Sequence, residues 1–305
     1  YPPEDLLLRS SLDLRVQEAL SKIASESLGL YQIIGYPKTV EGRLYNMAGV
    51  FYEGELLGEY AKQQLPNYQV FDEKRYFAAG SDILTLDIKG VKTAISICED
   101  IWHAPVMAQA KSANAKLMLN LNASPFHIDK PTHREELLKE RAIQGGMPIT
   151  YVNLVGGQDE LVFDGGSMVV DQSGTLKARM QTYESGVAYV NCKLASGAIE
   201  AIEGEIAPER NQYESIYEAL VLGVRDYVNK NGFKGVLIGL SGGIDSGLTL
   251  PIAVDALGKD RVEAVMMPFK YTSQMSLHDA EDEANRLGVK YSVLPIEPMY
   301  DAFMH

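Results

Sequence analysis

The chain has 305 residues, which is long enough for two hydrophobic cores. Of these residues 46% are hydrophobic and 23% are charged, a composition typical of soluble globular proteins. Its net charge of -13 and pI near 4.9 argue against a basic nucleic-acid-binding surface. No apolar run approaches membrane-spanning length, and a signal peptide is not evident. Two distant cysteines, Cys98 and Cys192, lack metal-binding spacing and suit a reducing compartment. We therefore expect a cytoplasmic protein with no nucleic-acid or membrane partner.

Residues 1–192 carry the pattern of a mixed α/β domain. After a strand at 31–38, two hairpins are predicted at 46–60 and 82–97, with turns at Glu53-Gly54 and Lys89-Gly90. The remaining predicted elements are a helix at 104–115, a strand at 116–124, a helix at 132–146, a strand at 149–157 and a hairpin at 161–174 that turns at Gly165-Gly166. Because many of these strands are apolar on both faces, we expect a sheet covered by other layers.

Residues 193–212 are acidic, small and irregular, which predicts a linker between two domains. The second domain, 213–305, begins with a helix at 213–230. Strands then alternate with helices: strands are predicted at 235–240, 262–269 and 290–296, and helices from the glycine-rich turn to about 257 and at 277–288. This alternation indicates parallel βαβ units in a Rossmann-like, doubly wound sheet.

The stretch "IGLSGGIDSGLTL", 238–250, joins a buried strand to a helix through adjacent glycines. Glycine lets the backbone approach an anion, and a helix N-terminus supplies partial positive charge, so the stretch predicts a phosphate site. It has no Walker-type lysine to hold the β- and γ-phosphates. A loop of this kind suits ATP whose pyrophosphate leaves when the α-phosphate is attacked. The alternative is a tight strand–helix turn with an N-cap residue.

The motif SGGIDS resembles the signature of N-type ATP pyrophosphatases. The resemblance implies ATP binding by eight consecutive residues: Gly239, Leu240, Ser241, Gly242, Gly243, Ile244, Asp245 and Ser246. Asp245 is the expected ligand of Mg²⁺, which would join the protein to the phosphates.

Cys98 lies in "AISICEDIW", 94–102, where two acids follow it directly. A cysteine reacts as a thiolate, and adjacent anions disfavour that form. Cys98 is therefore either a small core residue or a nucleophile that is stabilised by a cation from elsewhere in the chain.

Three stretches, 1–9, 62–77 and 95–102, together resemble the nitrilase superfamily, most of all the glutaminase domain of glutamine-dependent NAD synthetases. The resemblance implies that Glu4 is the general base, Lys62 the cationic stabiliser and Cys98 the nucleophile. It also implies that Glu73 is a second, orienting acid. Three further positions are implied to bind glutamine: Tyr68, Ser124 and Lys130.

With the motif "VMMPFKYTSQMSLHDAEDEANRLGV", 265–289, nearly the whole chain resembles bacterial glutamine-dependent NAD synthetases. The family implies a nitrilase-like αββα sandwich over 1–192 and part of an ATP-pyrophosphatase domain over 213–305. It also implies a ligase that converts deamido-NAD to NAD with ammonia from glutamine, while ATP is cleaved to AMP and pyrophosphate. We expect the small-molecule partners glutamine, ATP and deamido-NAD, an ammonia channel, and a homo-oligomer in the full-length protein.

Other classes remain open from the residues alone. They are another ATP-pyrophosphatase amidotransferase, a nitrilase-type amidase joined to a nucleotide-binding module, a tRNA-modifying protein and a non-catalytic binding protein. The chain begins at Tyr1, with Glu4 almost terminal, and the second sheet stops after about three strands. We therefore expect both domains to be incomplete and predict that these 305 residues alone do not make NAD.

Overall fold

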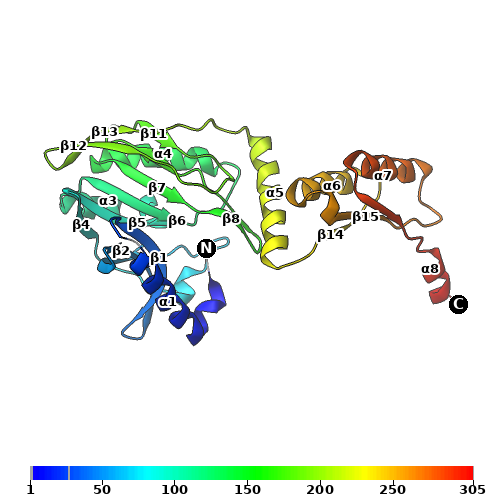
Figure 1. The fold of residues 1–305 in the computed structure, drawn as a ribbon, viewed down its shortest axis with the longest axis horizontal. Coiled ribbons are helices and arrows are strands. Elements are labelled where there is room, and N and C mark those ends of the chain that lie inside the picture. The colour runs from blue at the N-terminus through cyan, green and yellow to red at the C-terminus, as the bar shows by residue number, and fades with distance from the viewer. Residues whose placement is uncertain (1–2, 27, 305) are drawn as a thin grey trace. The chain divides into compact units, whose positions relative to one another are not determined.

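The computed structural model describes residues 3–26 and 28–304. The chain forms two compact units (Figure 1). The first takes in the residues up to Val155 and Phe163–Glu209, and the second takes in Gly156–Val162 and the residues from Arg210 onward. None of the helices in these ranges is both long and apolar enough to span a bilayer.

The first unit contains two sheets that face each other. The smaller is antiparallel in the order β1-β2-β3, with β1 at Gln32–Val40, β2 at Arg43–Tyr52 and β3 at Glu55–Ala61. The larger has the order β11-β10-β7-β6-β5-β4, with β4 at Leu84–Ile88, β5 at Val91–Ile97, β6 at Leu117–Asn122, β7 at Ile149–Asn153, β10 at Met168–Val170 and β11 at Leu176–Arg179. Both hairpins predicted at Glu53-Gly54 and Lys89-Gly90 are confirmed.

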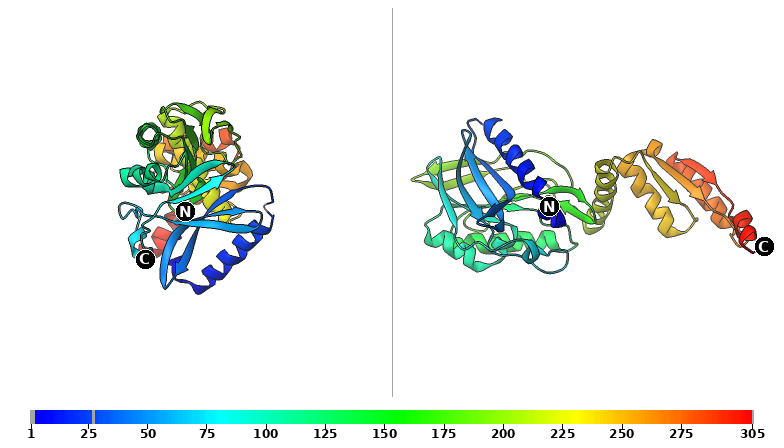
Figure 2. Two further views of the ribbon diagram at one scale, coloured as in Figure 1. Left: turned by 90° about the vertical axis from the view of Figure 1, so that its left-hand side faces the viewer. Right: turned by 90° about the horizontal axis from the view of Figure 1, so that it is seen from below.

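Helices cover the outer face of each sheet, so the layers are helix, sheet, sheet, helix. Helix α1 (Ser10–Glu26), which the sequence analysis did not predict, packs Leu20 and Ala24 on the small sheet. Helices α3 (Ala104–Ser112) and α4 (Lys130–Gly145) cover the large sheet. Figure 2 shows α1 and α4 on opposite sides of the strands. This arrangement is the expected αββα sandwich.

The two sheets meet in a core that holds the cysteine. Ala48, Val50 and Tyr60 of the small sheet pack against Ile95, Ile97 and Cys98 at the end of β5. Burial of apolar side chains between covered sheets explains why these strands lack a polar face. The sulfur of Cys98 is therefore placed at the seam of the sandwich by the packing itself.

Two sequence expectations are wrong in this unit. The residues around Gly165-Gly166 do not form one hairpin: β8 (Val155–Gln158) pairs with β9 (Leu161–Asp164), whereas β10 pairs with β7 and β11. The expected irregular linker contains a hairpin of β12 (Asn191–Ala195) and β13 (Ala198–Glu203). Its buried Ile199 and Ile202 pack on the first unit, and this apolar contact stabilises the hairpin.

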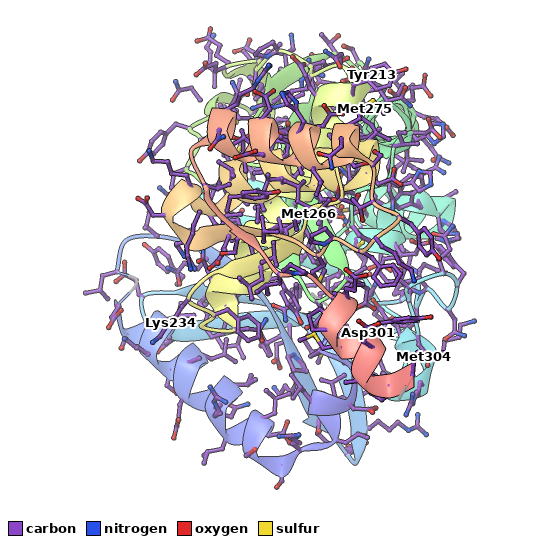
Figure 3. All side chains as sticks on the ribbon, turned by 90° about the vertical axis from the view of Figure 1, so that its right-hand side faces the viewer. Tyr213, Lys234, Met266, Met275, Asp301 and Met304 are labelled. Atoms are coloured by element: carbon purple, nitrogen blue, oxygen red, sulfur yellow. The ribbon has the colours of Figure 1, made fainter. Side chains whose placement is uncertain are left out.

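The second unit is built on a parallel sheet in the order β14-β15-β16. It comprises α5 (Gln212–Lys230), β14 (Val236–Gly239), α6 (Ile244–Leu257), β15 (Val262–Met266), α7 (Gln274–Leu287), β16 (Lys290–Val293) and α8 (Glu297–Met304). Figure 3 labels Met266 at the end of β15, Met275 in α7 and Asp301 in α8. The three strands lie side by side in the order in which they occur in the chain. The reversal of strand order that defines a doubly wound sheet is not found among these three described strands.

Candidate active site

Cys98 lies at a strained turn. Strand β5 ends at Ile97, and a 3-10 helix, Cys98–Trp102, begins at once. The φ angle of Cys98 is 45°, a left-handed conformation that costs a non-glycine residue free energy. Such strain persists only where the surrounding packing enforces it, and it recurs at catalytic positions.

A buried ion pair lies in the same cavity as Cys98. Lys62 follows β3, and only 2% of its side chain is exposed. Its Nζ donates to both carboxylate oxygens of Glu73, at 2.7 and 2.8 Å. Glu73 opens the short helix α2 (Glu73–Tyr76). Burial raises the pKa of Glu73, and the Lys62 ammonium opposes that rise.

Burial favours the protonated form of the Cys98 thiol. Burial raises its pKa above the ordinary value of 9.0, Lys62 acts in the opposite direction, and Glu73 and Glu99 raise it further. The roles implied for Lys62 and Glu4 led us to expect both within hydrogen-bonding reach of the sulfur, yet the described residues include no such bond. Lys62 instead donates to Glu73, because a carboxylate is the stronger acceptor. A proton must therefore leave the thiol when Cys98 attacks a substrate.

One cavity of about 490 Å³ brings the four predicted catalytic residues together. Its lining includes Glu4, Lys62, Glu73, Cys98, Phe71, Tyr76 and Asn122. Glu4 begins the 3-10 helix Glu4–Leu8 with a φ of 44°, and its side chain is exposed. Its carboxylate makes no hydrogen bond or ion pair within the described residues. Glu4 therefore shares the cavity with Cys98, whereas Glu73 is the acid that contacts Lys62.

Two of the three predicted glutamine-binding residues flank Phe71, a residue of the cavity lining. The rings of Tyr68 and Phe71 meet edge to face at 6.0 Å, and the Lys130 Nζ lies 5.9 Å above the Phe71 ring. Burial lowers the pKa of Lys130, and nearby Arg134 lowers it further. Tyr68 and Lys130 thus provide a hydroxyl and a cation beside the cavity.

Ser124, the third residue, is held inside the protein. Only 2% of it is exposed, and Arg134 Nη2 donates to its carbonyl oxygen at 2.9 Å and to its Oγ at 3.2 Å. Arg134 in turn forms a buried ion pair with Asp164, with both Nη1 contacts at 2.8 Å. Ser124 is not part of the cavity lining. Its contacts with Arg134 favour a role for Ser124 in supporting the neighbouring loop.

The two acids after Cys98 have separate partners, which sequence reasoning missed. Glu99 accepts the Tyr68 hydroxyl on both oxygens, at 3.0 and 2.9 Å. Asp100 is fully buried and accepts hydrogen bonds from Tyr60, Gln63, Gln64 and Ile97. Their positions next to Cys98 were the signal in the sequence that they matter. The fold was needed to show that the two side chains point to different partners.

The glycine-rich loop of the second unit lies between β14 and α6. Ser241 N donates to Ser246 Oγ at 3.1 Å, and Ser246 Oγ donates to the Gly243 carbonyl at 3.1 Å. The first-turn amides of α6, at Ile244 and Asp245, have no intrahelical acceptor. The loop and helix therefore present N–H groups that suit a phosphate.

Gly242 fits this loop because it has no side chain. Its φ is 74°, and a Cβ there would lie 2.8 Å from the Cα of Ser276 and would overlap the Ser276 carbonyl oxygen. Ser276 lies in the first turn of α7, whose N-cap is Ser273. Gly242 thus lets the loop pack directly against a second helix N-terminus.

Asp245 is exposed near the start of α6. The described residues contain no cluster of three acidic, histidine or cysteine side chains that could hold a metal alone. Magnesium is commonly held by one or two carboxylates together with substrate phosphates, so a single exposed Asp245 beside a phosphate loop fits it.

The chain is similar to glutamine-dependent NAD(+) synthetases along its whole length. The chain is 43% identical to the glutamine-dependent NAD(+) synthetase of Acinetobacter baylyi, over 100% of this chain and 56% of that protein. It matches the structure of the Acinetobacter baumannii enzyme in complex with ADP with a TM-score of 0.94 and 42% identity, over 100% of this chain and 57% of that one. The chain thus spans about half the length of these relatives.

The chain also resembles a variant of an amidase from a Nesterenkonia species, with a TM-score of 0.52 and 26% identity over 60% of this chain and 70% of that one. Residues 216–305 match the NAD synthase family, and residues 9–198 match the carbon–nitrogen hydrolase family. The second match covers more than half of the chain. The chain therefore belongs to the carbon–nitrogen hydrolase family.

Proposed function

We propose that the first unit hydrolyses glutamine at Cys98 and that the second unit uses the ammonia to convert deamido-NAD to NAD. The observation that carries the proposal is the strained Cys98 in one cavity with the buried Lys62–Glu73 pair. The amidase relative supports it, since that structure shows covalent addition of an acetamide moiety at its active-site cysteine.

At the first site, the Cys98 sulfur attacks the side-chain carboxamide carbon of glutamine. The bond from that carbon to nitrogen breaks, ammonia leaves, and a thioester remains on Cys98. Water then attacks the thioester, which releases glutamate and returns the thiol. Because burial favours the protonated thiol, the reaction needs a base that accepts this proton and passes it to the leaving ammonia.

We assign the base role to Glu4 and the cationic role to Lys62. Glu73 engages Lys62 with both oxygens, which suits an orienting acid better than a base. Glu4 has no competing ionic partner within the described residues and lines the cavity. Lys62 then stabilises the negative charge that develops on the carboxamide oxygen when the sulfur attacks the carbon.

Two charged groups on the α-carbon of glutamine, its carboxylate and its ammonium, have candidate partners of opposite charge beside the cavity. Lys130 suits the α-carboxylate, and Tyr68 with Glu99 suits the α-ammonium. Ser124 supports this region through its backbone. The free thiol that the reaction needs fits a reducing, cytoplasmic setting.

In the second unit, residues 239–246 hold the phosphates of ATP. The carboxylate of deamido-NAD attacks the α-phosphate, pyrophosphate leaves, and ammonia displaces AMP from the resulting adenylate. Asp245 would hold Mg²⁺, which neutralises phosphate charge. The ADP complex of the Acinetobacter baumannii relative supports nucleotide binding.

The test measures glutamate release and NAD formation by the full-length protein supplied with glutamine, ATP and deamido-NAD. We expect both products from the native protein and neither from Cys98→Ala, whereas Cys192→Ser retains both activities. Xanthosine monophosphate and simple amides serve as competing substrates. Glutamate release that survives in Cys98→Ala would overturn the assignment of the nucleophile.

A further inference from the structure

Asp100 joins the two strands that carry the catalytic pair. Lys62 follows β3 of the small sheet, whereas Cys98 follows β5 of the large sheet. Asp100 lies in the 3-10 turn that begins at Cys98, and none of its surface is exposed. The carboxylate therefore occupies the seam between the two sheets.

Four hydrogen bonds engage this carboxylate, two on each oxygen. Oδ1 accepts the backbone N–H groups of Gln63, at 3.1 Å, and Gln64, at 2.8 Å. Oδ2 accepts the backbone N–H of Ile97, at 3.0 Å, and the hydroxyl of Tyr60, at 2.8 Å. One oxygen thus holds the residues after Lys62, and the other holds the residue before Cys98.

We propose that Asp100 is a positioning residue that sets the spacing between Lys62 and Cys98. The backbone of Lys62 is otherwise tied to its surroundings by its N–H, which donates to the Asn46 carbonyl, and by its carbonyl, which accepts from Gly80. Neither bond reaches the turn at Cys98. Within the described residues, Asp100 is the side chain that bonds both segments.

The chemistry of the four donors requires an ionised aspartate. Each carboxylate oxygen accepts two bonds, and asparagine would direct its own NH₂ group at two donors. Burial raises the pKa of Asp100, and the backbone and tyrosine donors oppose that rise. Asp100→Asn must therefore lose the contacts of one oxygen, either those from Gln63 and Gln64 or those from Ile97 and Tyr60.

The proposal rests on the proposed function only in taking Cys98 as the nucleophile and Lys62 as the cation that stabilises it. The rate of Cys98 alkylation by iodoacetamide measures the reactivity of the thiol without glutamine. The test therefore gives a result even if the protein has no glutaminase activity. The background is Cys192→Ser, because Cys192 is an exposed second thiol. The charged side chains that act on the Cys98 thiol include Lys62, Glu73, Glu99, Lys130 and Arg134.

The sign of the effect separates positioning from simple charge removal. Loss of a nearby anion by itself favours a thiolate and speeds alkylation. Displacement of Lys62 does the opposite, because an opposite charge near the sulfur shifts thiol ionisation by about one pH unit. We expect Asp100→Asn to slow alkylation at pH 7.5 about tenfold. An unchanged or faster rate in the folded variant overturns the proposal.

A double-mutant cycle tests whether the effect passes through Lys62. In a Lys62→Met background, Asp100→Asn should change alkylation by less than about twofold, because the cation is already absent. An equal slowing in both backgrounds would indicate general loosening and would reject positioning. The matched control is Asp171→Asn, since Asp171 also accepts two backbone N–H groups and a hydroxyl, in the turn between β10 and β11. It should leave alkylation unchanged.

Tyr60→Phe provides the second variant if Asp100→Asn does not fold. It removes one of the four bonds, adds no charge and leaves the three backbone donors in place. We expect alkylation to slow about threefold, in line with the loss of one hydrogen bond. A rate equal to or above that of the parent protein would count against the positioning role.

Discussion

Lys62 and Glu73 form an ion pair in which one ammonium contacts both oxygens of one carboxylate, at 2.7 and 2.8 Å. Only 2% of the lysine side chain and 14% of the glutamate side chain are exposed. Because either charge alone would be costly in this environment, the pair acts as a unit. It fixes a cation beside a thiol whose protonated form burial favours.

Lys62→Met should destabilise the first unit by about 3 kcal/mol, because it leaves Glu73 buried without a partner. Glutamate release should fall by at least about 100-fold through loss of the oxyanion stabiliser. Urea denaturation and a glutamate assay measure the two effects. Lys38→Met is the control: its ion pair with Glu59 is more exposed, so activity should stay within about twofold. Equal losses in both variants would refute a special role for Lys62.

Glu73→Gln should separate thiol reactivity from turnover. Glu73 raises the pKa of the Cys98 thiol, so its neutralisation should speed alkylation at pH 7.5. Glutamate release should nevertheless fall about tenfold or more, because Lys62 loses its carboxylate acceptors. Iodoacetamide kinetics and glutamate assays on one preparation measure both. A change of both rates in the same direction would contradict the orienting role.

Glu4→Gln should lower the rate of glutamate release about 100-fold and leave iodoacetamide alkylation of Cys98 unchanged. The first expectation follows from loss of the general base, and the second from the lack of a direct contact between Glu4 and the thiol. Asp5→Asn, which changes a neighbouring exposed acid on the same short helix, is the control. If glutamate release by Glu4→Gln matches that of the control, another group is the base.

The Cys98 thiol should make the stability of the first unit depend on alkaline pH. Burial raises its pKa above 9.0 in the folded chain, so the folded state holds this proton longer than the unfolded state. The contribution to stability is complete below pH 9.0 and declines as pH rises through the folded-state pKa. Denaturant unfolding between pH 8 and pH 10 should therefore show a smaller decline in Cys98→Ala than in the parent chain.

Gly242→Ala should abolish ADP binding and destabilise the second unit, because the new methyl group meets the backbone of Ser276. Gly232→Ala is the matched control. Gly232 has a similar φ of 71°, but a Cβ there meets no atom within 4 Å. Gly232→Ala should lower the free energy of unfolding by only about 1 kcal/mol and leave ADP binding intact. Calorimetry that finds equal ADP affinity in both variants would remove the loop from the nucleotide site.

The sequence predicted those parts of the fold that are marked by local patterns. Hairpin turns at Glu53-Gly54 and Lys89-Gly90 and the strand–loop–helix around Gly242 are confirmed, because turn chemistry and periodicity act over short distances. The pairing of β10 with β7 could not be read in this way, since strands distant in sequence compete for the same partner. The largely exposed hairpin β12–β13 was missed because its apolar residues are few.

The catalytic set was predicted only through family resemblance, and its geometry needed the fold. In the sequence, Glu99 and Asp100 both stand as anions that disfavour a thiolate at Cys98. In the structure, Glu99 binds Tyr68, whereas Asp100 accepts four donors at the seam of the sheets. No local pattern contains that difference, because Tyr68 and Tyr60 are brought to these acids by tertiary packing.

The role of Cys98 as nucleophile is tested most directly by mass spectrometry of the protein quenched in acid during turnover of glutamine. We expect that a fraction of the chain gains one γ-glutamyl group through a thioester, which peptide mapping locates at Cys98. The adduct should be lost on treatment with hydroxylamine and should never form in Cys98→Ala. Glutamate release without any adduct at Cys98, or an adduct at Cys192 instead, would contradict the account.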